Sequence, residues 1–218
     1  MFSDNYILNI PETVKKRVVI VGGGFAGLKL ALKLQRKKFQ IVMLDKNNYH
    51  LFQPLLYQVA MSGLEPSAIS FPLRKVFQNT GIFFRMAELE TINPDKNELV
   101  TDIGHIKYDF LVLATGAKTN FFNQEQIEKY TLQMKSAPDA LYIRNRILEN
   151  FEKALNKENE EDVKSYLNVA IIGGGPTGVE LAGAMAEMKK YVLPKDYPEL
   201  DMRNMKIMLF EASPRLLS

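Results

Sequence analysis

The 218-residue sequence contains no cysteine and no tryptophan, and its two histidines are His50 and His105. Without a thiol, the chain can form no disulfide, no thiolate zinc site, no iron–sulfur cluster and no dithiol redox relay. Two histidines are too few for a histidine-rich metal site. We therefore expect no bound metal.

Long apolar runs are absent as well. No segment approaches the roughly 18 to 20 apolar residues that a membrane-spanning helix needs. The first 16 residues, MFSDNYILNIPETVKK, carry an early Asp and no apolar core of signal-peptide length. A net charge of +3 on scattered basic residues gives no reason to expect nucleic-acid binding. We expect no export signal and a cytoplasmic location.

The sequence contains one pattern twice. RVVIVGGGFAGLKLALKL starts at Arg17 and NVAIIGGGPTGVELAGAM starts at Asn168, so the first glycines, Gly22 and Gly173, are 151 residues apart (173 − 22). Each copy has the apolar run of a strand buried on both faces, then G-x-G-x-x-G, then apolar residues at helical spacing. In such a loop the first glycine allows a tight turn, the second lets a pyrophosphate approach, and the third lets the helix pack on the strand. The phosphate lies at the helix N-terminus.

An acidic residue ends the strand that follows each glycine loop. Asp45 lies 18 residues after Gly27, and Glu211 lies 33 residues after Gly178; most of the 15 extra residues (33 − 18) fall in YVLPKDYPELDMRN, which indicates a surface excursion. Both acids are placed to accept hydrogen bonds from a ribose. Glu211 would repel a 2′-phosphate, which favours NAD(H) over NADP(H), but the nearby Arg215 keeps that choice open.

The remaining segments complete an α/β fold. QIVMLD at 40–45 predicts a strand, IFFRMAELETI and ELVT around the turn NPDKN predict an antiparallel insertion, and YDFLVLATG at 108–116 predicts a return strand to the parallel sheet. SAPD at 136–139 is a capping box that starts a helix, NKENEED at 156–162 is typical of a linker, and a further helix is expected over about 176–190. We predict two Rossmann-like dinucleotide-binding units, the first with an antiparallel meander insertion and the second truncated.

With these elements the sequence resembles the two-dinucleotide flavoprotein reductases of the pyridine nucleotide-disulfide oxidoreductase superfamily. Within them it is most similar to the N-terminal half of type II NADH dehydrogenases, the single-subunit NADH:quinone oxidoreductases. The match is carried by the paired loops, by GGGPTGVELAG at 173–183, by YDFLVLATGA at 108–117 and, most specifically, by NYHLFQPLLYQVA at 48–60. It covers the chain after about residue 16. The resemblance implies an FAD-binding domain at 1–120, a connecting helix and linker at 121–167, and an incomplete NADH-binding domain at 168–218.

The resemblance also implies roles for individual residues. It implies contacts to FAD from Gly22, Gly24, Phe25, Ala26, Gly27, Asp45, Lys46, Gln53, Ala114, Thr115 and Gly116. It implies contacts to NADH from Gly173, Gly175, Pro176, Thr177, Gly178 and Glu211. Glu180 matches a glutamate near the flavin–nicotinamide contact and is the catalytic candidate, although the helix dipole alone favours an acid there. Gln53, Leu55 and Leu56 are candidates for lining the isoalloxazine, with core packing as the alternative for the leucines. For His50 we expect a surface or hydrogen-bonding role.

Disulfide reductases of this architecture carry a cysteine pair beside the flavin, where the resemblance places LFQPLLYQVA. The chain lacks cysteine, so the reduced flavin must pass its electrons to an external acceptor, and the resemblance implies a quinone. It also implies that the full-length protein is peripheral on the inner face of the membrane through a C-terminal part outside this sequence, with a homodimer as an open alternative to a monomer.

A complete member of the type II NADH dehydrogenases is about twice this length. We therefore expect the 218-residue chain alone to retain FAD weakly or not at all, and to be inactive with quinone. Two other functions stay open: a soluble FAD-dependent NAD(P)H reductase with a protein acceptor, and a truncated, non-catalytic nucleotide-binding module.

Overall fold

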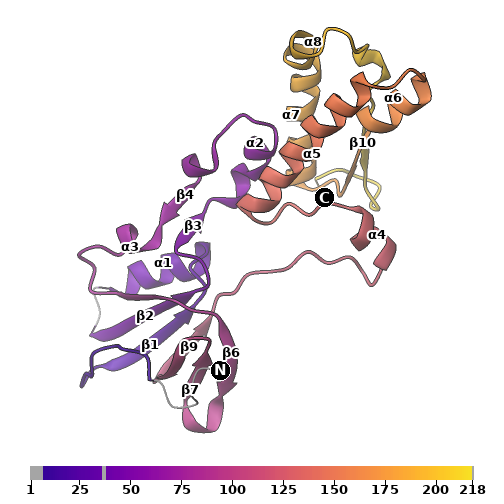
Figure 1. The fold of residues 1–218 in the computed structure, drawn as a ribbon. Helices are drawn as coiled ribbons and strands as arrows, with labels where there is room; N and C mark the ends of the chain where they lie inside the picture. Colours follow the sequence, from indigo (N-terminus) through magenta and orange to yellow (C-terminus); the bar gives the residue numbers. More distant parts are fainter. Residues whose placement is uncertain (1–6, 36–37, 218) are drawn as a thin grey trace. The chain divides into compact units, whose positions relative to one another are not determined.

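The computed structural model describes residues 7–35 and 38–217, which divide between two compact units (Figure 1). The first unit comprises Met1–Leu51 and Ser70–Lys118, and the second comprises Phe52–Ile69 and Thr119–Ser218. Residues 52–69 lie within the sequence predicted as the FAD-binding domain, and in the structure they belong to the second unit.

The first unit is built on a parallel sheet with the strand order β5-β2-β1-β9. Its strands are β1 (Lys16–Val21), β2 (Phe39–Asp45), β5 (Phe83–Met86) and β9 (Phe110–Leu113). Val18 pairs with Ile41 on one side and with Phe110 on the other, so the predicted strand, second strand and return strand are confirmed. The prediction that residues 82–86 belong to the antiparallel insertion is wrong, because β5 pairs in parallel with β2.

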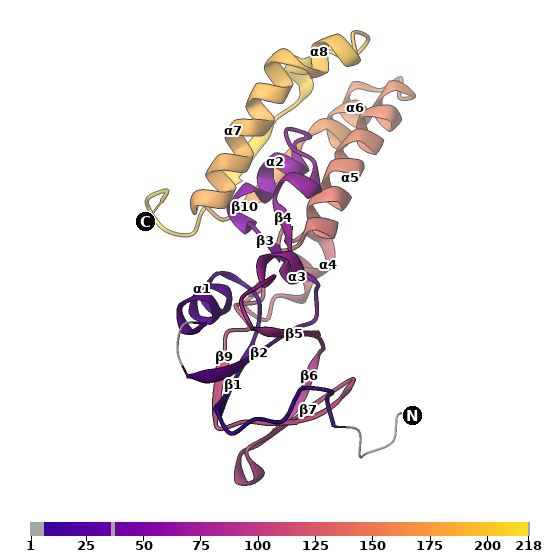
Figure 2. The same ribbon diagram turned by 90° about the vertical axis from the view of Figure 1, so that its left-hand side faces the viewer.

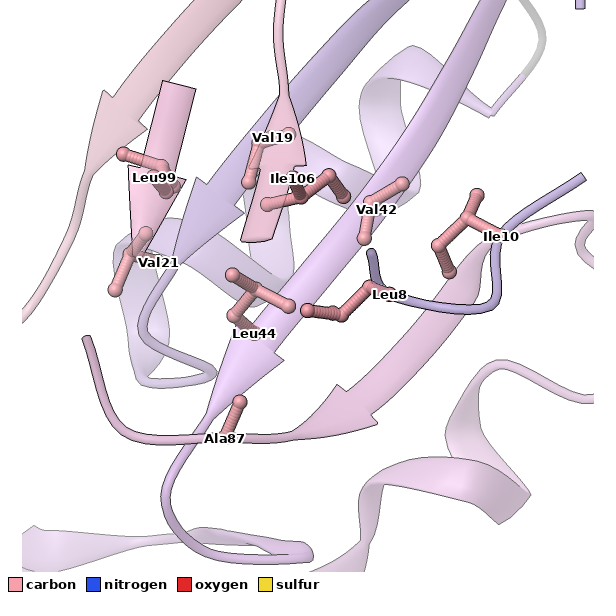
Figure 3. Packing of buried hydrophobic residues seen from close by; sticks show 9 residues of the cluster. All are labelled: Leu8, Ile10, Val19, Val21, Val42, Leu44, Ala87, Leu99 and Ile106. Atoms are coloured by element: carbon pink, nitrogen blue, oxygen red, sulfur yellow. The ribbon is translucent and has the colours of Figure 1, made fainter. Parts of the chain in front are cut away.

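Alternating side chains of this sheet are buried on its two faces. Val18, Ile20, Ile41 and Met43 pack with Ala31 of α1 (Phe25–Leu34) and Leu73 of α3 (Leu73–Val76). On the other face, a second cluster contains Val19, Val21, Val42 and Leu44 together with Leu99 and Ile106 (Figure 3). Burial on both faces explains why the strands are continuous apolar runs without alternation.

Leu99 and Ile106 come from the predicted antiparallel meander, which is confirmed. Its strands are β6 (Leu89–Asn93), β7 (Glu98–Thr101) and β8 (Gly104–Lys107), in the order β6-β7-β8, with the short helix η3 (Pro94–Lys96) in the first turn. A second antiparallel pair is formed by β3 (Tyr49–Leu51) and β4 (Ser70–Pro72). The chain leaves the first unit after β3, at residue 51, and returns to it at residue 70, where β4 begins. The unit therefore has a helical layer, a parallel sheet and a meander layer.

The second unit contains a two-stranded parallel sheet of β10 (Val169–Ile172) and β11 (Ile207–Phe210). Helix α7 (Pro176–Tyr191) connects these strands and packs on both of them (Figure 2). The other helices of the unit are η1 (Gln53–Leu55), α2 (Leu56–Ala60), η2 (Pro66–Ala68), α4 (Glu125–Tyr130), α5 (Ala137–Leu155), α6 (Glu160–Leu167), α8 (Leu193–Asp196) and η4 (Met202–Asn204). The predicted α/β fold with two βαβ units is confirmed.

Two helices of the second unit, α5 and α6, lie where the sequence predicts a capped helix and a linker. The capping box at the start of α5 is confirmed, because the Ser136 hydroxyl accepts from Asp139 N at 3.2 Å and Ser136 N donates to the Asp139 carboxylate at 2.9 Å. The linker predicted at 156–162 is wrong in its second half, where α6 begins. The Asn159 side chain caps this helix by accepting from Glu161 N at 2.9 Å, and the acidic first turn is stabilised by the helix dipole.

Among residues 7–35 and 38–217, no helix is long and apolar enough to cross a bilayer.

Candidate nucleotide-binding sites

The first glycine loop joins β1 to α1, and two of its glycines are fixed by the protein's own packing. Gly22 has a φ of +106°, and a Cβ there would meet the backbone of Ala114. A Cβ on Gly27 would fall on the carbonyl oxygen of Gly22. Gly22 N also donates to Leu44 O at 2.8 Å, which ties the loop to β2. These glycines thus provide the tight turn and the close helix packing that the sequence predicts.

Gly24 is in a different situation. Its φ of −71° suits any residue, and beyond its two chain neighbours no protein atom lies within 4 Å of the position that a Cβ would take. The fold itself therefore does not require glycine here, and the space above the backbone is open. Gly24 is the N-cap of α1, which has no side-chain cap and no acidic residue in its first turn. An open, uncapped helix start fits the approach of an anionic group.

Asp45 and His50 both form hydrogen bonds with Gly23, the residue between Gly22 and Gly24. Asp45 Oδ2 accepts from Gly23 N at 2.5 Å, and its Oδ1 accepts from Asn47 N at 2.7 Å. Each carboxylate oxygen keeps a further lone pair with which to accept from a ribose hydroxyl. His50 Nδ1 lies 2.9 Å from Gly23 O, and the residue is only 7% exposed. The hydrogen-bonding role expected for His50 is confirmed and the surface position is wrong.

The remaining predicted FAD contacts divide between the two units. In the first unit, Ala114 N donates to Val21 O at 2.8 Å, which brings the end of β9 beside the glycine loop. Thr115 and Gly116 follow it, and Phe25, Ala26 and Lys46 are exposed. Gln53, Leu55 and Leu56 belong to the second unit. There the Gln53 side chain donates to Lys135 O at 3.4 Å, and Leu56 is buried in α2, which packs against α5 and α7.

The second glycine loop, between β10 and α7, repeats the pattern of the first. Gly173 has a φ of +107° and donates its N–H to Phe210 O at 2.8 Å, as Gly22 does to Leu44 O. A Cβ on Gly178 would fall on the Gly173 carbonyl oxygen. Gly175, the N-cap of α7, has a φ of −71° and open space where a Cβ would project. The two loops therefore share the positive φ of the first glycine, the open second glycine and the close packing of the third, but a Cβ on Gly173, unlike one on Gly22, would meet nothing within 4 Å.

Glu211 occupies the position in the second unit that Asp45 occupies in the first. Its Oε2 accepts from Gly174 N at 2.6 Å, and its Oε1 accepts from Ser213 N at 2.7 Å. The N–H groups of Ser213 and Gly174 lower the pKa of the Glu211 carboxyl, in that order of effect, so the group is anionic at neutral pH. Pro176 and Thr177 begin α7 and are exposed, and Glu180 is an exposed residue one turn further along.

Comparison with known proteins gives this geometry a family. The sequence profile of the pyridine nucleotide-disulphide oxidoreductase family matches residues 16–218. The chain belongs to this family. It is 35% identical over 208 residues to a type II NADH:quinone oxidoreductase of Mycobacterium tuberculosis, a match that covers 93% of this chain and 45% of that protein. A type II NADH:quinone oxidoreductase of Haemophilus influenzae is 32% identical over 93% of this chain and 52% of its own length.

The solved structures agree with the sequence comparisons on the fold. The structure of NDH2 from Plasmodium falciparum in complex with NADH superposes with a TM-score of 0.86 at 28% identity, over 93% of this chain and 43% of that one. This member of the pyridine nucleotide-disulphide oxidoreductase family thus spans about half, or less, of the length of the relatives that it matches.

Proposed function

We propose that this chain is the nucleotide-binding part of an FAD-dependent NADH:quinone oxidoreductase. The observation that carries the proposal is the pair of glycine loops, each with two sterically required glycines, one open glycine at an uncapped helix start, and an acid that holds the loop. Type II NADH:quinone oxidoreductases among the relatives, and the NADH complex of a similar structure, support it.

FAD is assigned to the first unit. Gly24, Phe25, Ala26 and Gly27 present the start of α1 to the pyrophosphate, and Asp45 accepts from the ribose with the lone pairs that Gly23 N and Asn47 N leave unused. We further assign to FAD the first-unit residues Gly22, Lys46, Ala114, Thr115 and Gly116.

NADH is assigned to the second unit. Gly173, Gly175 and Gly178 form the loop, Pro176 and Thr177 open the helix that faces the pyrophosphate, and Glu211 accepts from the ribose. Because the pKa of Glu211 is lowered, its carboxylate is charged at neutral pH and opposes a 2′-phosphate at the same place. This supports NADH over NADPH as the donor.

In the proposed reaction the protein contributes mostly alignment. FAD, when bound, supplies a group that takes hydride from NADH and passes electrons on. Glu180 is the residue that we propose acts near the hydride transfer. The absence of cysteine leaves no internal disulfide to receive electrons, so we propose a quinone as acceptor. We also propose a peripheral location on the inner membrane face, through segments outside this sequence, and a homodimer as an assembly to test.

The proposal is tested by the visible absorbance of the purified chain after addition of FAD, before and after anaerobic NADH. Flavin bands that co-purify or appear on FAD uptake, and that bleach with NADH, support two functioning sites. A chain that takes up neither nucleotide means that these 218 residues alone do not build the sites, and the functional assignment then belongs to a longer protein. Bleaching that is followed by reoxidation with a ferredoxin-type protein favours the alternative of a protein acceptor over quinone.

Matched variants separate the two sites. Gly24→Leu fills the open space in the first loop, and Gly175→Leu fills the equivalent space in the second. We expect Gly24→Leu to abolish FAD uptake while NADH binding persists, and Gly175→Leu to do the reverse. If both variants impair the same nucleotide, the assignment of one nucleotide to each unit is contradicted.

A further inference from the structure

The peptide that joins Gly23 to Gly24 is at the centre of the first loop, and its orientation has consequences for binding. In a trans peptide the carbonyl and the following N–H point in opposite directions. Whatever holds the Gly23 carbonyl therefore also sets the direction of the Gly24 N–H. That N–H belongs to the N-cap residue of α1, beside the open space of the loop.

The two glycines restrict the orientation of this peptide less than residues with a Cβ would. Rotating it changes ψ of Gly23 and φ of Gly24, and both residues lack a Cβ that would resist the change. Beyond its chain neighbours, Gly24 has no protein atom within 4 Å of its Cβ position, whereas a Cβ on Gly23 would lie 2.7 Å from Leu73 Cδ1, so the space is open on the Gly24 side only. Hydrogen bonds to this segment therefore contribute to fixing the orientation. Asp45 holds the Gly23 N–H, which lies on the preceding peptide.

The carbonyl on the Gly23–Gly24 peptide itself is held by His50. His50 Nδ1 lies 2.9 Å from Gly23 O, and because a carbonyl only accepts, Nδ1 must carry the proton. The ring is held in place in turn. His50 is 7% exposed, its strand β3 pairs it with Phe71 of β4, and its ring meets the ring of Phe25 edge-on at 5.1 Å.

The second loop provides an internal comparison. Gly174 occupies the place of Gly23, and its carbonyl accepts instead from the backbone N–H of Leu217, also at 2.9 Å. The two loops thus share the glycines and the acid but differ in the group that fixes the central peptide. In the first loop that group is a side chain, which a single substitution can remove.

We propose that His50 is a positioning residue of the first site: it fixes the Gly23–Gly24 peptide and so directs the Gly24 N–H away from itself, toward the pyrophosphate of FAD. The role toward FAD rests on the proposed function, whereas the fixing of the peptide does not. Phe25, the first residue of α1, keeps the imidazole in place by its edge-on contact.

The first test uses NMR of the ¹⁵N-labelled chain without nucleotide. His50→Phe keeps an aromatic ring and loses the donor, His50→Asn keeps a donor near the Nδ1 position, and His105→Phe removes the other histidine as a control. We expect the Gly24 amide signal to shift or broaden in His50→Phe only, with the Gly175 signal unchanged in every variant. An unchanged Gly24 signal in His50→Phe overturns the proposal.

The same sample settles the matter if His50→Phe fails to fold. A long-range proton–nitrogen spectrum of the unmodified chain reports which ring nitrogen of His50 carries the proton. A ring protonated on Nδ1 supports the proposal, and a ring protonated on Nε2 alone overturns it.

The second test measures nucleotide affinity by fluorescence titration. Loss of one hydrogen bond of typical net strength is expected to weaken FAD binding about threefold to tenfold in His50→Phe. His50→Asn and His105→Phe should stay close to the unmodified chain, and NADH binding should not change. Equal FAD affinity of His50→Phe and the unmodified chain overturns the role in binding. If the unmodified chain takes up no FAD, the role of His50 in FAD binding fails for this chain, and the NMR result still decides whether His50 fixes the peptide.

Discussion

Gly27→Ala and Gly24→Ala are the same chemical change, three residues apart in one loop, and the structure predicts opposite consequences. A methyl group on Gly27 falls on the carbonyl oxygen of Gly22, whereas a methyl group on Gly24 meets no atom within 4 Å. Gly27→Ala should therefore damage folding. Gly24→Ala should leave folding intact and act on nucleotide binding alone.

The magnitudes follow from what can move. The Gly22 oxygen is backbone, and Gly22 N is tied to Leu44 O at 2.8 Å, so the loop cannot easily yield. Forcing an extra carbon into such a site costs about 1–3 kcal/mol of unfolding free energy, or more. For Gly24→Ala, restricting the unfolded chain gains about 0.4–1 kcal/mol. An alanine N-cap is worse than glycine by a comparable amount, about 0.5–1 kcal/mol. The net change at Gly24 should lie within about 0.5 kcal/mol of zero.

Urea denaturation followed by circular dichroism measures both values, with the slope of the transition checking that each variant unfolds from a comparable state. The second loop supplies an independent repeat, since a methyl group on Gly178 falls on the Gly173 oxygen and one on Gly175 meets nothing within 4 Å. Equal destabilisation by Gly27→Ala and Gly24→Ala would refute this steric reasoning. So would a stable Gly178→Ala variant.

Three further predictions concern the second unit. Burial and the hydrogen bond to Glu152 raise the pKa of Tyr197 from 10.0 to about 12. The contribution of Tyr197 to stability is therefore full below pH 10 and is lost as the pH rises toward 12. Tyr197→Phe should flatten this alkaline decline of the unfolding free energy in urea, and an unaltered decline would contradict the prediction. The pKa of Glu211 is lowered, so its contribution to stability is present above the usual pKa of 4.5 and fades as the pH falls. Glu211→Gln should remove this loss of stability at acid pH. The same variant should reduce the preference for NADH over NADPH in binding titrations. Ser136→Ala removes the N-cap of α5 and should lower the unfolding free energy by about 1 kcal/mol in urea, whereas Ser136→Asp should retain most of it.

Local sequence patterns predicted the parts of this fold that are held by local interactions. The glycine spacing gave both strand–loop–helix turns because the steric demands of Gly22 and Gly27 arise within a few residues of each loop. The capping box of α5 joins two residues three positions apart, Ser136 and Asp139. The acids Asp45 and Glu211 were found because the strand after each loop ends beside it.

The errors come from interactions that the local pattern does not contain. The residues of β5 are followed directly by those of the meander, but β5 pairs in parallel with β2, which lies about 40 residues earlier in the chain, and the local pattern does not contain that pairing. The acidic run before α6 indicates a linker by composition, yet the Asn159 cap and the buried Leu167 make it the start of a helix. Acids directly after an Asn are themselves typical of a helix N-terminus.

His50 illustrates what a repeated sequence motif predicts about a site and what it does not. The two loops share three glycines, and the two central carbonyls are both held at 2.9 Å, but by an imidazole in one loop and by a backbone N–H in the other. The steric features of the site are predicted by the glycine spacing, because glycine is required wherever the backbone turns and packs in this way. The hydrogen bond that fixes the central peptide can come from any donor that the fold brings near, including one from outside the motif. Similarity between the two loops therefore predicts that each can receive a pyrophosphate. It does not predict that they respond alike to mutation, and a substitution at position 50 should separate them.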